Sequence, residues 1–295
     1  MHLYIIIHLY FSSKMQRNKI MRKPIKYIFF DCMETLVDLH RLPTMRDYAA
    51  WAYEGSGLEG YWEDLDEFFR YYILSKQELE SKLPEHADYE LRGRFSHLVQ
   101  LSLPQLPYGL VESTADILYR NYWHNYKSGS YVRDEVKEAL IKLKERYRLG
   151  VVSNFMVIGG IEEMLEIHGI RGYFDFVVTS VAEGWKKPHQ AIYQKALELA
   201  CIEPEQVIFV GDDYVNDYMA PLEMGMWSVL LDRFNRHPEL NRHAEPGHPD
   251  LSIPPKQKHP ELDTLPKPGH PGLIRHPEWE YRVSDFTQLV GLLSG

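Results

Sequence analysis

The sequence predicts an α/β protein in which a parallel sheet carries helices on both faces and an all-helical block is inserted early in the chain. After residue 130, short apolar runs of strand length alternate with amphipathic helical stretches, a pattern typical of a parallel sheet. Residues 43 to about 127 show apolar side chains at three- and four-residue spacing, with no convincing strand. One apolar run, residues 27–30, precedes this block. The core domain is therefore expected to be discontinuous in sequence.

Two helices of the block are well marked. Residues 64–74 place large apolar side chains on one face. A second helix is expected over residues 113–126, with Ser113 as its N-cap. Aromatic residues are dense throughout the block, which indicates a packed helical core or, for a few of them, a substrate-binding surface.

The elements after the block follow in order. We expect strands at residues 149–152, 176–179, 207–210, 228–231 and 281–283. We expect helices at residues 134–147, 160–168, 191–199, 218–223 and 285–293. Helices between consecutive strands favour parallel connections.

Two segments fit neither pattern. Residues 1–20 form an N-terminal extension whose apolar part, residues 1–11, is shorter than the about 20 residues needed to span a bilayer. It lacks the features of a signal peptide. With Met15 and Met21 as alternative starts, it reads as an upstream mis-start or a disordered tail, or else as a weak membrane anchor.

The second segment, residues 234–280, repeats the dipeptide His-Pro at His237, His248, His259 and His270. Repeated prolines oppose a long helix or a central strand. We expect an extended surface loop inserted in the core, or a site at which the regular histidines bind a metal such as Zn²⁺ or Ni²⁺.

Composition narrows the class of protein. The 295 residues are 44% hydrophobic, 25% charged and 13% aromatic, as in globular proteins of one large or two ordinary domains. A net charge of -9 argues against nucleic acid as a partner. Two cysteines, Cys32 and Cys201, suggest no disulfide framework and favour a cytoplasmic location. Cys32, beside Asp31, is either reactive or a small buried strand residue.

Polar motifs follow four of these elements. Asp31 ends the first apolar run, and Ser153-Asn154 ends the strand at 149–152. The strings Gly184-Trp185-Lys186-Lys187-Pro188 and Gly211-Asp212-Asp213-Tyr214-Val215-Asn216-Asp217 come later. Each is weak alone, but in open α/β sheets ligands bind at the carboxyl ends of the strands, where these motifs would meet.

The string Asp31-Cys32-Met33-Glu34-Thr35-Leu36 resembles the first motif of the haloacid-dehalogenase-like hydrolases, Asp-x-Asp-x-Thr-Leu, except at Met33. The other three strings resemble the second, third and fourth motifs of that superfamily. The resemblance covers roughly residues 26–293 without the His-Pro repeat. It implies a Rossmann-like core of residues 21–38 and 128–295 and a helical cap of residues 39–127.

The resemblance also implies roles. Asp31 would be the nucleophile that forms an aspartyl phosphate. Mg²⁺ would be held by Asp31, the Met33 backbone carbonyl and Asp212. Asp217 belongs to the same metal group and, together with Asp213 as a possible second residue, would hold a metal-bound water or Lys187 in place. The competing interpretation of the three aspartates is a turn with N-capping carboxylates.

The remaining motifs would bind the phosphoryl group. Lys187 would neutralise its charge, and Lys186 is the alternative in register. Ser153 and nearby backbone N–H groups would bind a phosphoryl oxygen, with Asn154 also in contact with the substrate.

Met33 stands where most phosphatases of this superfamily carry their general acid. Glu34 could move into the site instead, or the leaving group could need no proton, as in an acyl phosphate or a halide. The carboxylates at Asp212, Asp213 and Asp217 disfavour a dehalogenase, because halide displacement needs no divalent cation. A phosphonatase-like enzyme would use a cap lysine, and Lys76, Lys82 and Lys127 are available.

The sequence therefore predicts a Mg²⁺-dependent phosphatase that acts on a small phosphorylated metabolite, with no nucleic-acid or membrane partner. The alternatives are a dehalogenase- or phosphonatase-like hydrolase and a catalytically weakened sensor of a phosphorylated ligand. The pattern selects neither a substrate nor an oligomeric state.

Overall fold

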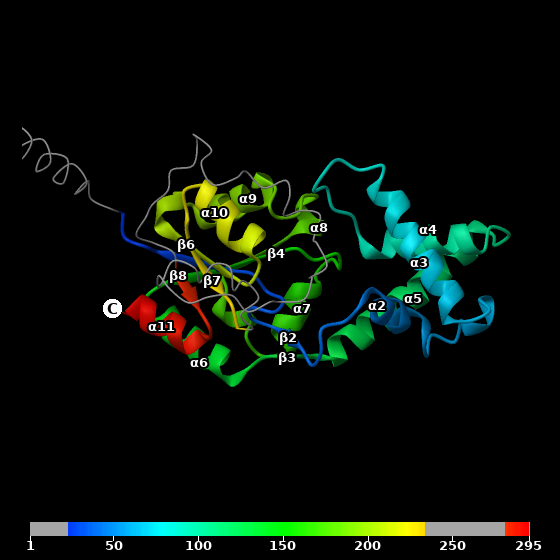
Figure 1. Cartoon of the computed structure of the whole chain (residues 1–295), viewed down its shortest axis with the longest axis horizontal. Helices are drawn as coiled ribbons and strands as arrows, with labels where there is room; N and C mark the ends of the chain where they lie inside the picture. The colour runs from blue at the N-terminus through cyan, green and yellow to red at the C-terminus, as the bar shows by residue number, and fades with distance from the viewer. Residues whose placement is uncertain (1–22, 234–280, 295) are drawn as a thin grey trace, which may run out of the picture.

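The computed structural model describes residues 23–233 and 281–294. Its main sheet has six parallel strands in the order β5-β4-β1-β6-β7-β8 (Figure 1). The strands are β1 (Tyr27–Phe30), β4 (Arg148–Ser153), β5 (Phe176–Thr179), β6 (Val207–Gly211), β7 (Trp227–Leu231) and β8 (Tyr281–Val283). The parallel-sheet prediction is confirmed.

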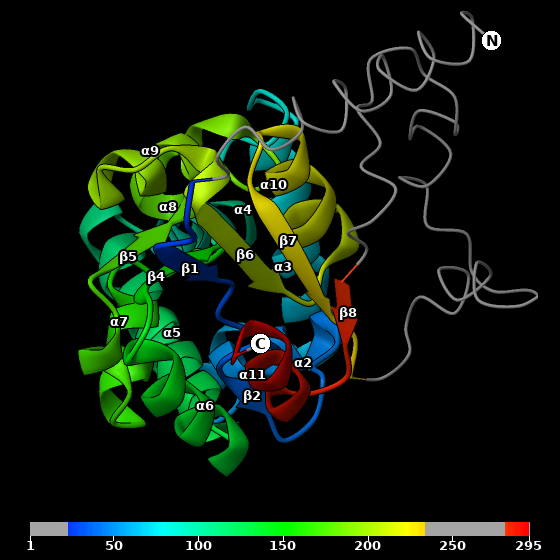
Figure 2. The same cartoon turned by 90° about the vertical axis from the view of Figure 1, so that its left-hand side faces the viewer.

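Strand β1 lies at the centre of the sheet and is buried on both faces. Tyr27 and Phe29 face one apolar cluster, which includes Tyr193 of α9 (Gln190–Ala200). Ile28 and Phe30 face the other cluster, which includes Phe286 of α11 (Phe286–Ser294). Helix α6 (Asp134–Lys144), helix α7 (Gly160–Ile167) and α11 cover this second face, whereas α9 and α10 (Ala220–Glu223) lie on the first (Figure 2). An all-apolar strand therefore takes the central position of a parallel sheet.

The helical block consists of α2 (Met45–Tyr53), a short 3₁₀ turn (Glu59–Tyr61), α3 (Leu65–Glu80), α4 (Leu91–Ser102) and α5 (Tyr108–Ser128). These helices pack on one another to one side of the sheet (Figure 1). The chain enters and leaves the block through β2 (Asp38–Leu39) and β3 (Ser130–Tyr131), which pair antiparallel.

Most predicted elements are confirmed to within one or two residues. Helix α3 runs six residues beyond the predicted end at 74, α6 ends three residues before the predicted 147, and the predicted start of α5 was wrong. Helix α5 begins after Pro107, so Ser113 lies inside it and bonds the carbonyl of Leu110 instead of capping the helix. The helix predicted at 218–223 is α10, preceded by a wider π-helical turn from Tyr214 to Met219. Such turns are frequent at functional sites.

The predicted boundaries of core and cap stay a prediction. The N-terminal extension at 1–20 and the His-Pro repeat at 234–280 lie outside the described residues. Among the residues that are described, no helix combines the length and apolarity that crossing a membrane requires.

Candidate active site

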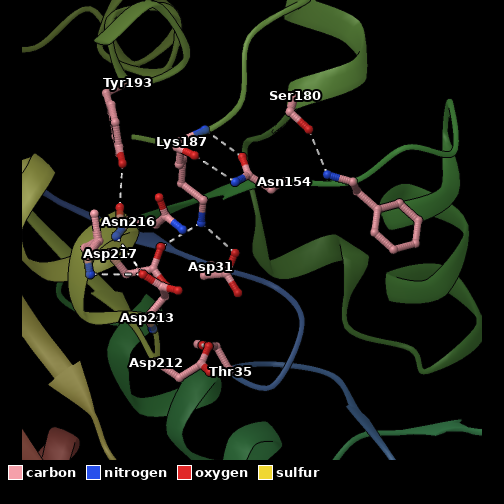
Figure 3. Close-up of polar contacts among 12 residues, drawn as sticks. Asp31, Thr35, Asn154, Ser180, Lys187, Tyr193, Asp212, Asp213, Asn216 and Asp217 are labelled. Atoms are coloured by element: carbon pink, nitrogen blue, oxygen red, sulfur yellow. Dashed lines mark hydrogen bonds and ion pairs between the residues drawn. The ribbon is translucent and has the colours of Figure 1, made fainter. Parts of the chain in front are cut away.

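The polar motifs meet at the carboxyl ends of three neighbouring strands. Asp31 follows β1, Ser153 ends β4 and Asp212 follows β6. Lys187 reaches the same place from the loop between α8 (Ser180–Glu183) and α9 (Figure 3). Parallel strands in register thus bring together residues that are far apart in the sequence.

Lys187 is the cation of this site. Its Nζ lies 2.7 Å from Oδ1 of Asp31 and 2.6 Å from Oδ1 of Asp217. Burial by itself lowers the pKa of Lys187, but the two carboxylates outweigh this effect and raise the pKa, so the side chain stays an ammonium. Lys186 is half-buried, and its backbone N–H donates to His86. The structure therefore places Lys187, and not Lys186, at Asp31.

Asn154 holds the backbone of Lys187 from both sides. Its Nδ2 donates to the Lys187 carbonyl at 3.0 Å, and its Oδ1 accepts from the Lys187 N–H at 2.7 Å (Figure 3). This pair fixes the loop that carries the ammonium. The side chain of Asn154 thus has a partner other than substrate, while Ser153 beside it is 1% exposed at the end of β4.

Three carboxylates form a candidate metal group. Oxygens of Asp31, Asp212 and Asp217 all lie within 4.8 Å of one another. Thr35 donates its hydroxyl to Oδ1 of Asp212 at 3.2 Å, which orients that ligand. An added Cβ at Gly211 would lie 2.4 Å from Cγ of Asp217, so the glycine leaves the space that this carboxylate occupies.

Asp213 differs from its neighbours. Its Oδ1 accepts from the N–H groups of Val215 and Asn216, so it caps the turn that follows. The N-capping interpretation thus fits Asp213. Asp217 is instead turned back toward Lys187, and its Oδ2 accepts from the backbone of Asp213 at 3.0 Å.

The charges of the group favour a bound cation. Asp217 is 1% exposed; burial raises its pKa, Asp31 raises it further, and Lys187 opposes both effects. Lys187 can neutralise only one of the three carboxylates when all are ionised. Oxygen ligands of this kind suit a hard cation such as Mg²⁺. The Met33 backbone carbonyl is the remaining expected metal ligand. The β-bridge between Met33 and Val37 is formed by the Cys32 carbonyl and the Glu34 N–H, so it does not use the Met33 carbonyl.

Met33 and Glu34 lie on the turn between Asp31 and β2. The Met33 side chain is partly buried against the large apolar cluster. Glu34 has a positive φ of 60°, unusual for a residue with a side chain. Burial raises the pKa of Tyr126 and of Tyr48, and the charge of Glu34 adds to both shifts. Glu34 therefore lies near the tyrosines of α2 and α5.

Glu34→Gly is expected to raise the free energy of unfolding by about 1 kcal/mol, because glycine adopts a positive φ without strain. Urea denaturation measures the change. Cys201→Gly, at an exposed position with φ 52°, is the matched control and should show a similar gain without altering turnover. A loss of stability in Glu34→Gly would mean that contacts of the Glu34 side chain outweigh the strain.

Arg233, at the end of β7, clamps this turn and was not anticipated from the sequence. Its Nη1 donates to the Glu34 carbonyl at 3.1 Å and to Oδ1 of Asp38 at 3.0 Å, and its Nη2 donates to the Thr35 carbonyl at 2.7 Å. Asp38 also accepts from Arg133 at 2.9 Å. The clamp fixes the backbone between the Asp31 carboxylate and the helical block.

Arg233→Met is expected to lower kcat by about 10- to 100-fold, because a loosened turn displaces groups that must be held within a fraction of an ångström. Steady-state kinetics measure kcat and KM, and circular dichroism checks the fold. Arg146→Met removes an exposed arginine that bonds the end of α11 and serves as control. An unchanged kcat in Arg233→Met would contradict the clamp's role in activity.

Cys32 is completely buried, and burial, with Asp31 next to it, raises the pKa of its thiol well above the usual value. The thiol therefore stays protonated. This agrees with the small buried strand residue and opposes a reactive cysteine.

Comparison with known proteins shows the family of this chain. A family model described as haloacid dehalogenase-like hydrolase matches residues 25–225. The chain is 33% identical to haloacid dehalogenase-like hydrolase domain-containing protein 3 of Bos taurus, over 71% of this chain and 83% of that protein. It is 32% identical to glyceraldehyde 3-phosphate phosphatase of Pyrococcus abyssi, over 70% of this chain and 80% of that one. Matches to domain-containing protein 3 of Xenopus laevis and Homo sapiens span only 34% and 47% of those proteins.

Solved structures share the fold. A 2-haloacid dehalogenase from Pseudomonas syringae superposes with a TM-score of 0.61 at 18% identity, over 92% of this chain and 98% of that one. A HAD phosphatase from Thermococcus onnurineus gives 0.55 at 16% identity, over 92% and 99%. The family model spans more than half of the chain, and the bovine and archaeal relatives are aligned over most of their own length. The chain therefore belongs to the haloacid dehalogenase-like hydrolases.

Proposed function

We propose that this hydrolase is a Mg²⁺-dependent phosphatase that transfers the phosphoryl group of a small phosphorylated metabolite to Asp31 and then to water. The observation that carries the proposal is the Lys187 ammonium, bonded to Asp31 and Asp217 beside the three-carboxylate group. A dianionic substrate approaching a carboxylate needs such positive charge. Relatives named glyceraldehyde 3-phosphate phosphatase support the substrate class.

Each residue of the site has a task in this reaction. An oxygen of Asp31 attacks phosphorus, the bond from phosphorus to the leaving oxygen breaks, and an aspartyl phosphate forms. Lys187 and the Ser153 hydroxyl bind the phosphoryl oxygens. Water then attacks phosphorus and regenerates Asp31. Asp31, Asp212 and the Met33 carbonyl would hold Mg²⁺, which would supply positive charge for the substrate, and Asp217 keeps Lys187 in place.

Met33 supplies no proton to the leaving group and activates no water. Losing a general acid–base group costs about 10²–10⁴ in rate. Glu34 is the nearest candidate in sequence for this task; its charge acts on the pKa of Tyr126, as does that of Asp31. The proposal therefore favours substrates with good leaving groups, such as acyl phosphates.

Two other functions are weaker. A phosphonatase-like enzyme needs a free cap lysine. Lys76 pairs with Glu80 at 2.6 Å and Lys127 pairs with Glu163, which leaves the exposed Lys82 as the remaining one of the three. A sensor of a phosphorylated ligand is the second candidate, and Met33 is the observation that favours it. A location in the cytoplasm, where phosphorylated metabolites are abundant, belongs to the same proposal.

Phosphate release from a metabolite panel separates these functions. With Mg²⁺, the purified protein should release phosphate from at least one acyl phosphate or triose phosphate. Thermal stabilisation by a phosphorylated compound without release would instead identify the sensor.

Mg²⁺ alone should raise the thermal midpoint of unfolding, because a cation at the carboxylates binds only the folded protein. At 100 times its Kd, such a ligand stabilises by about 2.7 kcal/mol. Asp212→Asn should lose most of the shift. Asp213→Asn should keep it, since asparagine also caps a turn. Equal shifts in both variants would place the metal elsewhere.

A further inference from the structure

Arg94, in α4, is a buried arginine without a carboxylate partner. The residue is 2% exposed. Its guanidinium lies over the Tyr72 ring, 3.9 Å from the centroid, and Nη2 donates to the Tyr72 carbonyl at 2.7 Å. Its Nε has no hydrogen-bond partner. Within the described parts of the chain, no carboxylate oxygen comes within the 4.0 Å of an ion pair with it.

Arg92, two residues earlier on the same helix, shows the opposite state. Its side chain is 35% exposed and pairs with Glu112 at 3.0 Å and Asp116 at 2.6 Å. Buried charges are normally paired, whereas exposed ones can rely on water. Here the half-buried Arg92 has two carboxylates and the buried Arg94 has none.

Burying a guanidinium in this way destabilises the folded protein unless hydrogen bonds and an opposite charge compensate the lost hydration. The bond to the Tyr72 carbonyl, stacking on the Tyr72 ring and a side-chain hydrogen bond with Tyr72 supply no negative charge and leave Nε without a partner. The buried hydroxyl of Tyr89 also lacks a partner, and the charge of Arg94 acts on its pKa against the larger effect of burial. The Arg94 Nε and the Tyr89 hydroxyl are therefore two buried polar groups without a hydrogen-bond partner.

The helix that carries Arg94 also contacts the domain that holds the parallel sheet. Leu91, one helical turn earlier, donates its N–H to the carbonyl of Met156 at 2.9 Å, in the segment that follows Ser153. This contact joins the start of α4 to the loop beside the candidate active site.

A run of aromatic rings leads from Arg94 toward the loop beside the candidate active site. Tyr122 lies 5.9 Å from Tyr126 between ring centroids. The raised pKa of Tyr122, due mainly to burial, is opposed by the charge of Arg94. The raised pKa of Tyr126, again due mainly to burial, also reflects Asp31. The ring contacts have the same order: Tyr72 under Arg94 lies 6.2 Å from Phe95, Phe95 lies 6.0 Å from Tyr122, and Tyr126 lies 5.6 Å from Phe155, two residues after Ser153.

We propose that Arg94 binds a carboxylate at the end of the substrate remote from the scissile phosphoryl group. A planar guanidinium matches a carboxylate through two parallel hydrogen bonds, and a single arginine balances its single charge. The substrate class is then a carboxyalkyl phosphate, with its phosphoryl group at Asp31 and its carboxylate at Arg94. This inference rests on the proposed phosphatase function.

Binding of unreactive analogues tests the inference without turnover. We would measure by calorimetry, with Mg²⁺, the Kd of ω-carboxyalkylphosphonates of increasing length and of the matched ω-hydroxyalkylphosphonates. Wild type should bind the carboxylate at one chain length at least ~10-fold more tightly than its hydroxyl counterpart, equivalent to about 1.4 kcal/mol. Arg94→Met should lose this preference, and Arg94→Lys should keep part of it.

Arg92→Met is the matched control and should keep the wild-type preference. If wild type shows no preference at any length, the inference is overturned whether or not the variants fold. It is also overturned if Arg94→Met weakens both series equally. Binding without phosphate release from the corresponding phosphates would contradict the phosphatase and leave the carboxylate site standing.

Discussion

Replacing Asp31 with asparagine is expected to lower kcat by at least ~10⁴-fold, because it removes the proposed nucleophile; removing a covalent nucleophile costs up to about 10⁶ in kcat. Lys187 keeps Asp217 as a partner, so the fold should persist. Phosphate release from the best substrate of the panel measures the loss.

Asp66→Asn is a suitable control, since Asp66 is an exposed aspartate of α3 that pairs with Arg46. It should keep wild-type turnover. Activity in Asp31→Asn close to that of Asp66→Asn would remove Asp31 from the reaction and leave the observed phosphate release to a contaminant or another site.

Met33→Asp is expected to raise kcat on an unactivated alkyl phosphate by about 10²–10⁴, the usual worth of a general acid–base group. On acyl phosphates, whose leaving group needs no proton, the gain should come only from faster hydrolysis of the aspartyl phosphate. The Met33 side chain is partly buried against apolar neighbours, so the variant should also unfold at a slightly lower temperature.

Met33→Asn separates shape from proton transfer, because asparagine matches aspartate in size but carries no titratable proton. It should stay at the wild-type rate. Equal rates for Met33→Asp and Met33→Asn would show that the site lacks more than a proton donor, which would favour the sensor.

The fold was largely predictable because its main signals are local. Buried parallel strands are continuous apolar runs, so β1 and β5 were predicted from sequence to within a residue. The start of α5 was missed because Pro107 begins a helix whose first turn, Tyr108 to Leu110, is exposed and breaks the apolar spacing. The π-helical turn before α10 was missed because it has no apolar spacing of its own by which the sequence could indicate it.

The sequence motifs identified the residues of the candidate site, but not the residues that hold them in position. Asp31, Lys187 and Asp217 are part of recognisable sequence motifs, and their side chains lie together in the structure. Arg233 contacts the Glu34 turn across 199 residues of sequence, a contact that depends on the pairing of β7 with β6 and of β6 with β1. The burial of Arg94 depends equally on how α3 packs on α4, because an arginine in an amphipathic helix normally faces solvent.

Mass spectrometry of acid-quenched protein during turnover tests the central claim most directly. The account predicts a phosphoryl group on the Asp31 side chain. It should accumulate in wild type, because Met33 cannot activate the water that removes it, and fall in Met33→Asp. Turnover with no phosphoryl group on Asp31, or with the label on another residue, would contradict the account.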